Sequence, residues 1–299
     1  MPELPEVETV KRGLGRLLPG LAITHVEHDT PKSFPNAKHD VAQFLIGANV
    51  VEVRRRAKVL LIELSSEYSL VIHLKMTGQL VYRSAPDAAA DVRFGAGHPN
   101  ASLIGQLPDK STRVILSLSN GAHVYFNDQR KFGWVRLIPT AEVPQIDFMK
   151  RVGPEPLSDE FSWQIMRERL QRRARTNIKA ALLDQSVLAG VGNIYADESL
   201  WGACIHPTTL VGNLKNAQIK LLHKALRDVL QLSIDMGGST DQHYVDAEGK
   251  PGKYLTFANV FRREGQPCSR CGTIIVKSRV AGRGTHTCPK CQKPKLRKV

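Results

Sequence analysis

The first residues of the chain could perform covalent chemistry. Pro2 follows the initiator methionine, and Glu3 and Glu6 stand close to it in the sequence. An initiator methionine is normally removed when the second residue is small, so we expect Pro2 to become a free secondary amine. Such an amine can attack an electrophilic carbon such as a sugar C1′, where it forms only a cationic iminium. A neighbouring carboxyl could donate the proton that the reaction needs.

A helix must hold this amine in place. Pro5 suits the first turn of a helix, and Glu6 and Glu8 suit its positive end. Four apolar residues then share one helical face: Val7, Val10, Leu14 and Leu17. Gly20 lies beyond the expected end. By composition alone, the same segment could be an ordinary N-terminal helix with acidic capping.

Four cysteines close to the end of the chain have the spacing of a structural zinc site. They are Cys268, Cys271, Cys288 and Cys291, two CxxC pairs separated by 16 residues. Four thiolates complete a tetrahedral zinc and leave no open position for catalysis. The residues between the pairs predict a β-hairpin with Arg283 at its tip, and so small a module would depend on the metal to fold. Cys204 stands alone among apolar residues, and we expect it to be buried.

The charge of the chain predicts a polyanionic partner. Its 299 residues carry 42 Lys and Arg against 28 Asp and Glu, a net charge of +14. Residues 265–299 contain nine Lys and Arg and no acidic residue, which could also be a solvated basic tail. No run approaches the ~18 apolar residues of a membrane span, and the N-terminus lacks the pattern of a secretion signal. We therefore expect a cytoplasmic protein that does not enter membranes.

The first half of the chain is rich in short strands. Expected strands cover residues 21–26, 50–53, 59–64, 70–74, 80–82, 114–118, 122–126 and 134–138, with a short helix at 40–46. The pair Asn120-Gly121 predicts a tight hairpin between two of them. Residues 84–110 are expected to form a long loop or insertion. Many short strands joined by turns predict an antiparallel β-sandwich.

The second half is expected to be helical. A linker at 153–156 leads to a predicted helix start at Ser158, and further helices are expected at 178–188, 194–201 and 217–236. A second linker, 237–253, leads to the cysteines. The chain is therefore predicted to be an α+β multidomain protein, with domains at 2–150, 151–240 and 241–299. A glycine turn at 190–192 could place Asn193 at a helix N-terminus, which attracts phosphate, or could be a plain turn.

Two runs resemble one known family. Met-Pro-Glu-Leu-Pro-Glu-Val-Glu-Thr at residues 1–9 resembles the N-terminal signature of the formamidopyrimidine-DNA glycosylases, bacterial repair enzymes for oxidised purines. Residues 177–185 and 189–198 resemble the helix–two-turn–helix of the same family. The resemblance implies a monomeric DNA glycosylase and AP lyase that acts on damaged double-stranded DNA and holds one structural zinc.

The resemblance also implies catalytic roles. Pro2 would attack C1′, Glu3 would assist departure of the base with a proton, and Glu6 would support the charge changes around the sugar. Lys58 follows a basic run at residues 54–56, which could also be a solvated edge; in the family this lysine reaches the active site. Arg283 would contact phosphates beside the lesion and assist the second elimination.

Further residues would bind DNA by the same resemblance. Met76, Arg130 and Phe132 follow strands at turns and would fill the space left by an extruded base, although a Met or Phe in such places is usually part of a core. Lys179, Asn193 and Arg263 would bind phosphates. Many relatives carry histidines where this chain has residues 110–113, and Ser111 could make a weaker contact there. Residues 261–263 are Phe-Arg-Arg where Tyr-Gly-Arg is common, so we expect only Arg263 to keep its role.

Three alternatives have different chemistry. An enzyme of the related endonuclease VIII type would prefer oxidised pyrimidines, a zinc-ribbon protein would bind DNA without catalysis, and a tautomerase would also use an N-terminal proline. The tautomerase explains neither the cysteines nor the charge, and Pro2 with Glu3 argues against the non-catalytic protein. Leu4 resembles the purine-acting branch, which we therefore expect. Residues 237–252 resemble the loop that covers an extruded purine in that branch, although they could be a linker.

Overall fold

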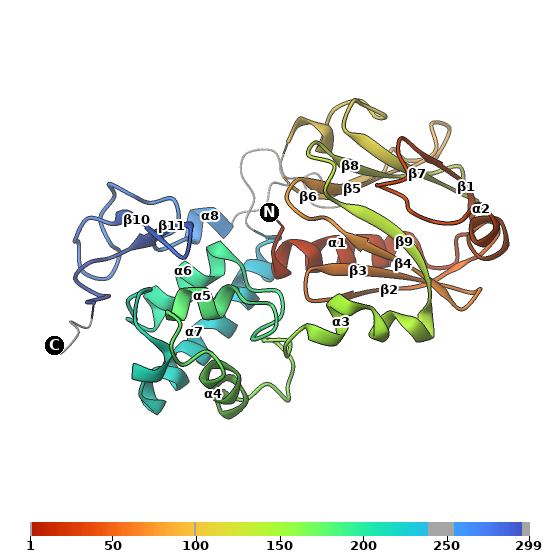
Figure 1. Ribbon diagram of the computed structural model, residues 1–299. Helices are drawn as coiled ribbons and strands as arrows, with labels where there is room; N and C mark the ends of the chain where they lie inside the picture. Colours follow the sequence, from red (N-terminus) through yellow and green to blue (C-terminus); the bar gives the residue numbers. More distant parts are fainter. Residues whose placement is uncertain (1, 99, 239–253, 295–299) are drawn as a thin grey trace. The chain divides into compact units, whose positions relative to one another are not determined.

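The computed structural model describes residues 2–98, 100–238 and 254–294. The chain divides into two compact units (Figure 1). The first unit holds residues 1–150 and 236–253, and the second holds residues 151–235 and 254–299. In this division, the helical region and the cysteine module share one unit. Among the described residues, every helix is too short or too polar to span a lipid bilayer.

Helix α1, Leu4–Leu17, begins the first unit, as predicted. Glu3 is its N-cap residue, and Glu3 and Glu6 form a reciprocal capping box. Pro5 lies in the first turn, where a missing N–H donor is not needed. Val7, Val10 and Leu14 are buried in the core, so the apolar face predicted from the spacing is the face that packs.

Two antiparallel sheets complete the predicted sandwich. One has the strand order β1-β7-β8-β5-β6 and the other β2-β3-β4-β9. The strands are β1 Ile23–His28, β2 Val50–Arg56, β3 Val59–Leu64, β4 Tyr68–His73, β5 Gly78–Arg83, β6 Arg93–Gly97, β7 Thr112–Leu118, β8 His123–Asp128 and β9 Trp134–Pro139. The predicted hairpin joins β7 and β8 around Gly121, whose φ is +77°. The short helix expected at 40–46 forms as α2, Lys38–Asp40, and a π-helical turn, Val41–Leu45.

Apolar side chains on both faces of β3 and β4 explain why these strands read as continuous hydrophobic runs. Residues 60, 62, 70 and 72 face the other sheet and form the main core with residues 80, 114, 124 and 126. The alternate residues 59, 61 and 71 pack under a 3₁₀ turn, Thr140–Gln145, and helix α3, Asp147–Arg151. Both faces of this sheet are therefore covered.

The segment 84–110 is not only a loop, which corrects the prediction. It contains β6, which pairs with β5 at the edge of the larger sheet, and a 3₁₀ turn, Ala101–Leu103. Arg93 stabilises the rest of the segment by donating to the carbonyls of Ser102, Leu103 and Ile104. The strand is rich in glycine and other small residues, which have no clear β pattern, so β6 could not be predicted from the sequence.

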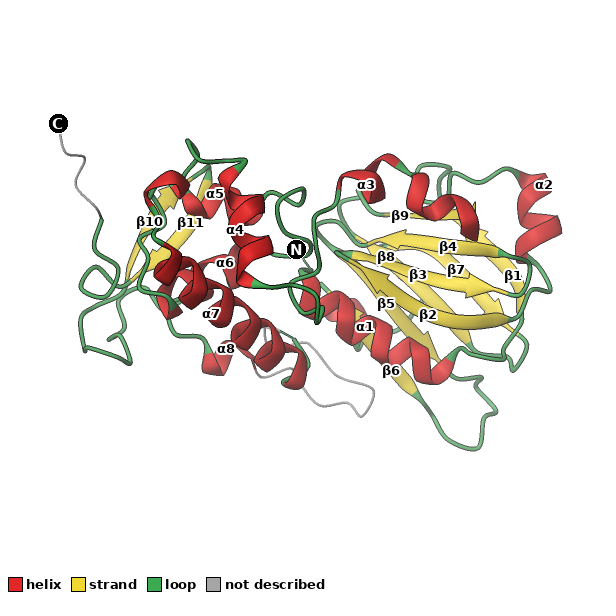
Figure 2. Ribbon diagram, turned by 90° about the horizontal axis from the view of Figure 1, so that it is seen from below, coloured by secondary structure: helices red, strands yellow, loops and turns green. Residues whose placement is uncertain are grey.

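Helix α1 packs along β2 and β6, the edge strands of the two sheets (Figure 2). Gly13 faces the ring of Phe94 from β6 so closely that an added Cβ would lie 2.1 Å from a ring carbon. Phe94 is fully buried. The segment expected to be an insertion therefore supports the helix that carries Pro2.

The described part of the second unit contains four main helices. They are α4 Trp163–Gln171, α5 Ile178–Leu183, α6 Asn193–Gly202 and α7 Asn216–Asp235, with a 3₁₀ turn at Val211–Asn213. Helix α4 begins after Ser162, whose hydroxyl accepts from the N–H of Ile165, so the predicted start at Ser158 was wrong. Helix α5 ends five residues before the predicted end, because residues 184–192 form the turns that lead to α6.

The cysteine module also belongs to the second unit. It begins with α8, Tyr254–Phe257, and contains the predicted hairpin of β10, Val276–Val280, and β11, Arg283–Thr287. The turn consists of Ala281 and Gly282, both with positive φ. Arg283 is therefore the first residue of β11, paired with Val280, and its side chain is exposed at the tip.

Candidate functional site

Pro2 is buried at the N-terminal end of α1, beside two carboxylates. The backbone N–H of Glu3 donates to Glu6 Oε2 at 2.7 Å, and the Glu3 side chain accepts from the backbone of Glu6. Both side chains are less than a tenth exposed, at 3% for Glu3 and 7% for Glu6. The helix start thus fixes two carboxyls beside the residue that was predicted to be the nucleophile.

Gly238 approaches the same carboxylate from the distant end of the first unit's sequence. A Cβ on Gly238 would lie 3.5 Å from Glu6 Oε1, and the φ of Gly238 is +94°, which a side chain would disfavour. The predicted base-covering loop begins at this point. Its residues 239–252 lie outside the described residues.

Lys58 lies in the turn between β2 and β3 and is only 5% exposed. Arg55, from the preceding basic run, donates to Glu8 of α1 at 2.9 Å and to the carbonyl of Ala57 at 3.0 Å. Arg54 instead pairs with Glu63 across the hairpin. The basic run is therefore only partly solvated: Arg54 is exposed, whereas Arg55 joins the turn that carries Lys58 to the helix that follows Pro2.

His73 is a buried residue near Lys58 that the sequence did not single out as functional. It ends β4, where the strand register pairs it with Val59, the neighbour of Lys58. Its Nδ1 accepts the backbone N–H of Lys75 at 3.0 Å. Burial, with the positive charges of Lys75 and Lys58, lowers the pKa of His73 to about 3. The imidazole is consequently neutral at physiological pH.

The two turns that carry the predicted wedge residues lie side by side. Asp128, at the end of β8, accepts the hydroxyl of Thr77 from one turn. It also accepts the N–H groups of Phe132 and Gly133 in the other turn, at 2.8 and 2.7 Å. The N–H of Arg130 donates to the Thr77 hydroxyl at 3.1 Å. The sequence reasoning missed Asp128, and its place at the end of a strand, directly before the turn with Arg130 and Phe132, was the available signal.

The wedge residues differ in exposure. Phe132 is 45% exposed, and the guanidinium of Arg130 lies 4.9 Å from the centre of its ring. Met76 is half-buried at the apex of the neighbouring turn. An aromatic side chain left this open at a turn is not part of the core, so Phe132 is available to an apolar partner such as a base.

The side chains of Ser111 and Arg113 make hydrogen bonds within the first unit. The Ser111 hydroxyl donates to Asp109 at 2.7 Å and is buried. Arg113 pairs with Asp29 at 2.7 Å and donates to the carbonyls of Lys110 and Asp128. A phosphate contact by Ser111 stays a prediction, and the burial of its hydroxyl does not favour it.

In the second unit, the glycine turn leads directly into α6. Gly192 is the N-cap residue, and Asn193 is the first helical residue, as predicted. Asn193 Nδ2 donates to the carbonyl of Gly284 at 3.0 Å. The dipole and the first N–H groups of α6 therefore lie beside the hairpin tip, an arrangement that suits an anion.

Lys179 is buried, in contrast to the expectation that it binds phosphate. Its side chain is 0% exposed and pairs with Asp197 of α6 at 2.7 Å. It also donates to Gly284 and Thr285 of the hairpin. Direct phosphate binding by Lys179 stays a prediction that its burial argues against.

Arg263 follows the segment 259–261, which is hydrogen-bonded to the carboxylate of Glu198 in α6. The buried side chain of Glu198 accepts the backbone N–H groups of Asn259, Val260 and Phe261, each at 2.8 Å. Burial raises the pKa of Glu198, against the lowering effect of these donors. The guanidinium of Arg263 donates to Gln266 at 3.0 Å and to the carbonyl of Ala258 at 3.2 Å. Arg263 as a phosphate ligand stays a prediction.

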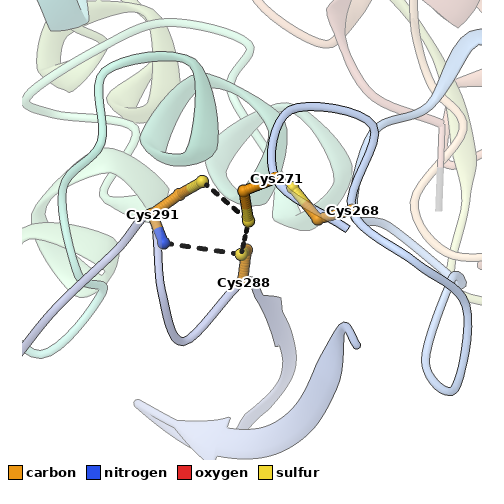
Figure 3. A group of neighbouring side chains, drawn as sticks. All are labelled: Cys268, Cys271, Cys288 and Cys291. Carbon is orange, nitrogen blue, oxygen red and sulfur yellow. Dashed lines mark hydrogen bonds between the residues drawn. The ribbon is translucent and has the colours of Figure 1, made fainter. Parts of the chain in front are cut away.

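The four cysteines converge as their spacing predicted (Figure 3). All four Sγ atoms lie within 4.8 Å of one another, and a tetrahedral zinc separates its sulfur ligands by about 3.8 Å. A hydrogen bond with Thr273 lowers the pKa of Cys271 to about 6, whereas burial and the neighbouring thiols raise that of Cys291 to about 12. Four such thiols cannot all ionise without a cation, so this donor set fits a divalent soft metal.

Cys204 is exposed, so the expectation that it is buried was wrong. It follows α6 with a φ of +55°, which turns the chain outward after the buried residues of the helix. Arg270, between the first two cysteines of the module, donates to Cys204 Sγ at 2.9 Å and lies over the ring of Trp201. The apolar neighbours of Cys204 in the sequence gave a wrong prediction of burial, because the residue lies in a turn after the helix.

Three family profiles match the chain. They are the formamidopyrimidine-DNA glycosylase N-terminal domain over residues 1–135, the H2TH domain of the same enzymes over residues 152–245, and a zinc finger found in FPG and IleRS over residues 265–294. A formamidopyrimidine-DNA glycosylase of Pelotomaculum thermopropionicum is 42% identical, covering 99% of this chain and 100% of that protein. One from Desulforamulus reducens is also 42% identical, with the same coverage.

Solved structures show the same similarity. A Lactococcus lactis FPG mutant in complex with a Fapy-dG containing DNA has a TM-score of 0.84 and 35% identity, over 98% of this chain and 100% of that one. MutM in complex with carbocyclic 8-oxo-G containing DNA has a TM-score of 0.83 and 35% identity, with the same coverage. MutM from Thermus thermophilus has a TM-score of 0.81 and 38% identity, over 97% and 98% of the two chains.

Proposed function

The chain belongs to the formamidopyrimidine-DNA glycosylase family, and we propose that it removes oxidised purines through a covalent intermediate at Pro2. It is a DNA repair enzyme that acts on damaged bases as a glycosylase and AP lyase. The observation that carries the mechanism is the position of Pro2, buried at the start of α1 beside Glu3 and Glu6.

Removal of Met1 would make Pro2 a secondary amine. Its nitrogen lone pair attacks C1′, and the bond from C1′ to the base breaks. Glu3 helps to deliver a proton to the departing base. The C1′–O4′ bond of the sugar ring then breaks, with a proton delivered to O4′, and the open sugar is left as an iminium at C1′. This iminium withdraws electrons from C2′ and acidifies its C–H bond. Loss of that proton expels the 3′ phosphate by β-elimination, and a second elimination expels the 5′ phosphate.

The neighbouring groups have supporting roles. Glu6 is held by the N–H of Glu3, so its negative charge stays near the sugar as positive charge develops there. Lys58 adds a positive charge that would suit a phosphate or the leaving base, and the Arg55–Glu8 pair links its turn to α1. Neutral His73 keeps this buried region from gaining a further positive charge.

The target base must leave the duplex before Pro2 can reach C1′. The exposed ring of Phe132, with Arg130 above it and Met76 in the adjacent turn, would fill the space that the base leaves. In the second unit, Asn193 and Arg283 would bind phosphates beside the lesion. One structural zinc held by Cys268, Cys271, Cys288 and Cys291 would maintain the hairpin that carries Arg283.

Oxidised purines are the proposed substrates. Two similar solved proteins, an FPG mutant and MutM, are in complex with DNA that contains Fapy-dG and carbocyclic 8-oxo-G, respectively. Leu4, the residue that resembles the purine-acting branch, is the first residue of α1 and is fully buried. We therefore expect 8-oxoguanine opposite cytosine, and ring-opened formamidopyrimidines, to be cut faster than thymine glycol.

Borohydride trapping tests the mechanism. Wild-type protein is incubated with duplexes that each carry 8-oxoguanine, a formamidopyrimidine, thymine glycol or an abasic site, with and without borohydride. We expect a trapped adduct whose peptide map places the DNA on Pro2, and impaired trapping by Pro2→Gly. Efficient trapping by protein with an acetylated or uncleaved N-terminus would refute the nucleophile, and faster cutting of thymine glycol than of 8-oxoguanine would refute the substrate class.

A further inference from the structure

We propose that Lys179 is a positioning residue, whose buried ammonium fixes the backbone of the hairpin tip at residues 283–285 and thereby orients Arg283. This inference rests on the proposed function, in which Arg283 contacts phosphates and assists the second elimination. Lys179 belongs to α5 and Arg283 begins β11, and both lie in the second unit.

Three acceptors surround the ammonium of Lys179. Its Nζ lies 2.7 Å from Asp197 Oδ1, 3.0 Å from the carbonyl oxygen of Gly284 and 2.6 Å from Thr285 Oγ1. Two of these groups, the Gly284 carbonyl and the Thr285 hydroxyl, accept hydrogen bonds from the ammonium, and Asp197 supplies the opposite charge. Because the side chain is wholly buried, its contacts hold the protein together instead of facing a ligand.

The chain of hydrogen bonds continues to Arg283 itself. Thr285 Oγ1 accepts from Lys179 and donates its own proton to the carbonyl of Arg283 at 3.0 Å. Lys179 therefore restrains two successive carbonyls, that of Gly284 directly and that of Arg283 through one hydroxyl. The side chain of Arg283 is exposed, so only its backbone is held and the guanidinium stays available.

Asn193 contacts the same tip. Its Nδ2 donates to the carbonyl of Gly284, which thus accepts from both Asn193 and Lys179 at 3.0 Å. One carbonyl group therefore joins the N-terminus of α6 to the start of β11. Lys179 fixes the geometry between two groups that are proposed to bind phosphates of one DNA strand.

Stability alone does not explain a buried ion pair at this position. Apolar residues of the same volume often give equal or greater stability than a buried pair, but they cannot bind carbonyl oxygens. Asp197 also accepts the backbone N–H of His286 at 2.9 Å, so the counter-ion is itself attached to β11. The pair is therefore suited to orientation: it holds the strand through polar groups at residues 284, 285 and 286.

A double-mutant cycle with Arg283 tests this role. Lys179→Met combined with Asp197→Asn removes both buried charges, and the asparagine can still accept the His286 N–H. Arg283→Ala is then introduced into wild type and into this pair variant. The measurements are zinc content, binding of abasic-site duplex, and the ratio of β,δ- to β-elimination products from that duplex.

We expect the pair variant to keep its zinc and to shift toward β-elimination products as Arg283→Ala does. Adding Arg283→Ala to the pair variant should then change the product ratio by less than about twofold, the range of additivity error for independent sites. If Arg283→Ala lowers the second elimination by the same factor in both backgrounds, Lys179 does not act through Arg283 and the proposal is wrong.

Two further variants keep the test decisive. Thr285→Val retains both charges but removes the hydroxyl that joins Lys179 to Arg283, and it should shift the products in the same direction. If the pair variant does not fold, a wild-type product ratio in Thr285→Val overturns the proposal. Tyr195→Phe is the matched control, since it removes a buried hydroxyl of α6 that contacts Ser233 at 2.6 Å, away from the hairpin.

The outcomes separate this inference from the proposed function. Wild-type protein that neither nicks abasic-site DNA nor forms a borohydride-trapped adduct would refute the function. Wild-type protein that does both, with additive effects in the cycle, would refute only the positioning role of Lys179.

Discussion

The first unit holds its candidate catalytic groups at the ends of an apolar frame, whereas the second unit holds its candidate DNA-binding groups through buried charges and thiols. In the first unit, α1 packs its apolar face on the sandwich and presents Pro2 and Glu3 at its start. In the second, buried Lys179, Asp197 and Glu198 attach the cysteine module to the helices.

Because of this difference, substitutions should affect the stability of the two units in different ways. An apolar frame can relax around a lost methyl group, so moderate substitutions shift a catalytic group and lower stability by a few kcal/mol. A buried charge or a metal ligand leaves an unmatched partner when it is removed, and the module it supports is lost as a whole. The expected effects below therefore decrease from the cysteine site to single turns of the first unit.

Loss of one zinc ligand is expected to have the largest effect. Cys288→Ser should abolish metal binding and weaken binding to damaged duplex by more than about a hundredfold, since structural zinc contributes on the order of 10 kcal/mol to folding of such modules. Zinc analysis and filter binding measure both losses. Circular dichroism should still report the strands of the first unit. Active protein without zinc would contradict this expectation.

His73 should make the first unit acid-sensitive. Its folded pKa is lowered to about 3, below the value of 6.5 expected when unfolded, so its contribution to stability is complete above pH 6.5. As pH falls from 6.5 toward 3, the unfolded chain binds a proton that the folded chain does not. Each pH unit in this window then removes about 1.4 kcal/mol, or about 3 kcal/mol by pH 4.

Urea unfolding of wild type and His73→Asn at pH 7 and pH 4 measures this effect. Asparagine keeps an oxygen that can accept the N–H of Lys75 but has no titratable ring. The variant should lose less stability between the two pH values than wild type does. An equal loss in both proteins would show that other groups cause the acid sensitivity.

Gly13→Ala should displace α1, the helix that begins beside Pro2. The new methyl group would meet the ring of Phe94 at 2.1 Å, and overpacking of this kind costs about 1–3 kcal/mol. We expect weaker borohydride trapping with DNA binding less affected. Phe94→Leu in the same chain makes room for the methyl group and should restore trapping. If the double variant is no better than Gly13→Ala, the contact does not set the position of α1.

Asp128→Asn is expected to have the smallest effect. The amide retains one oxygen for the N–H groups of Phe132 and Gly133 but places an N–H₂ group against other donors, a loss of about 1–2 kcal/mol. Because this residue joins the two wedge turns, nicking of 8-oxoguanine in a duplex should fall more than cleavage of a single-stranded abasic site. An equal loss of activity on both substrates would show that Asp128 does not act through Met76, Arg130 and Phe132.

The sequence predicted those parts of the molecule that depend on near neighbours. The helix of Pro2, most strands and the β7–β8 hairpin follow from spacing within a few residues, and the four-cysteine set follows from two CxxC pairs separated by 16 residues. The strand within residues 84–110 was missed because its stability comes from pairing with β5 and from the contact between Phe94 and Gly13. The start of α4 was misplaced because two nearby serines could each cap a helix.

Residue types and spacing alone determined the chemistry available to this protein: an amine next to carboxyls, a set of four thiols and an excess of positive charge. These features are local or additive, so they survive without knowledge of the fold. Only the tertiary structure decided which charges face solvent. Lys179 is buried against Asp197, Arg55 is joined to Glu8 and Cys204 is exposed, because burial depends on which distant segments pack around a side chain.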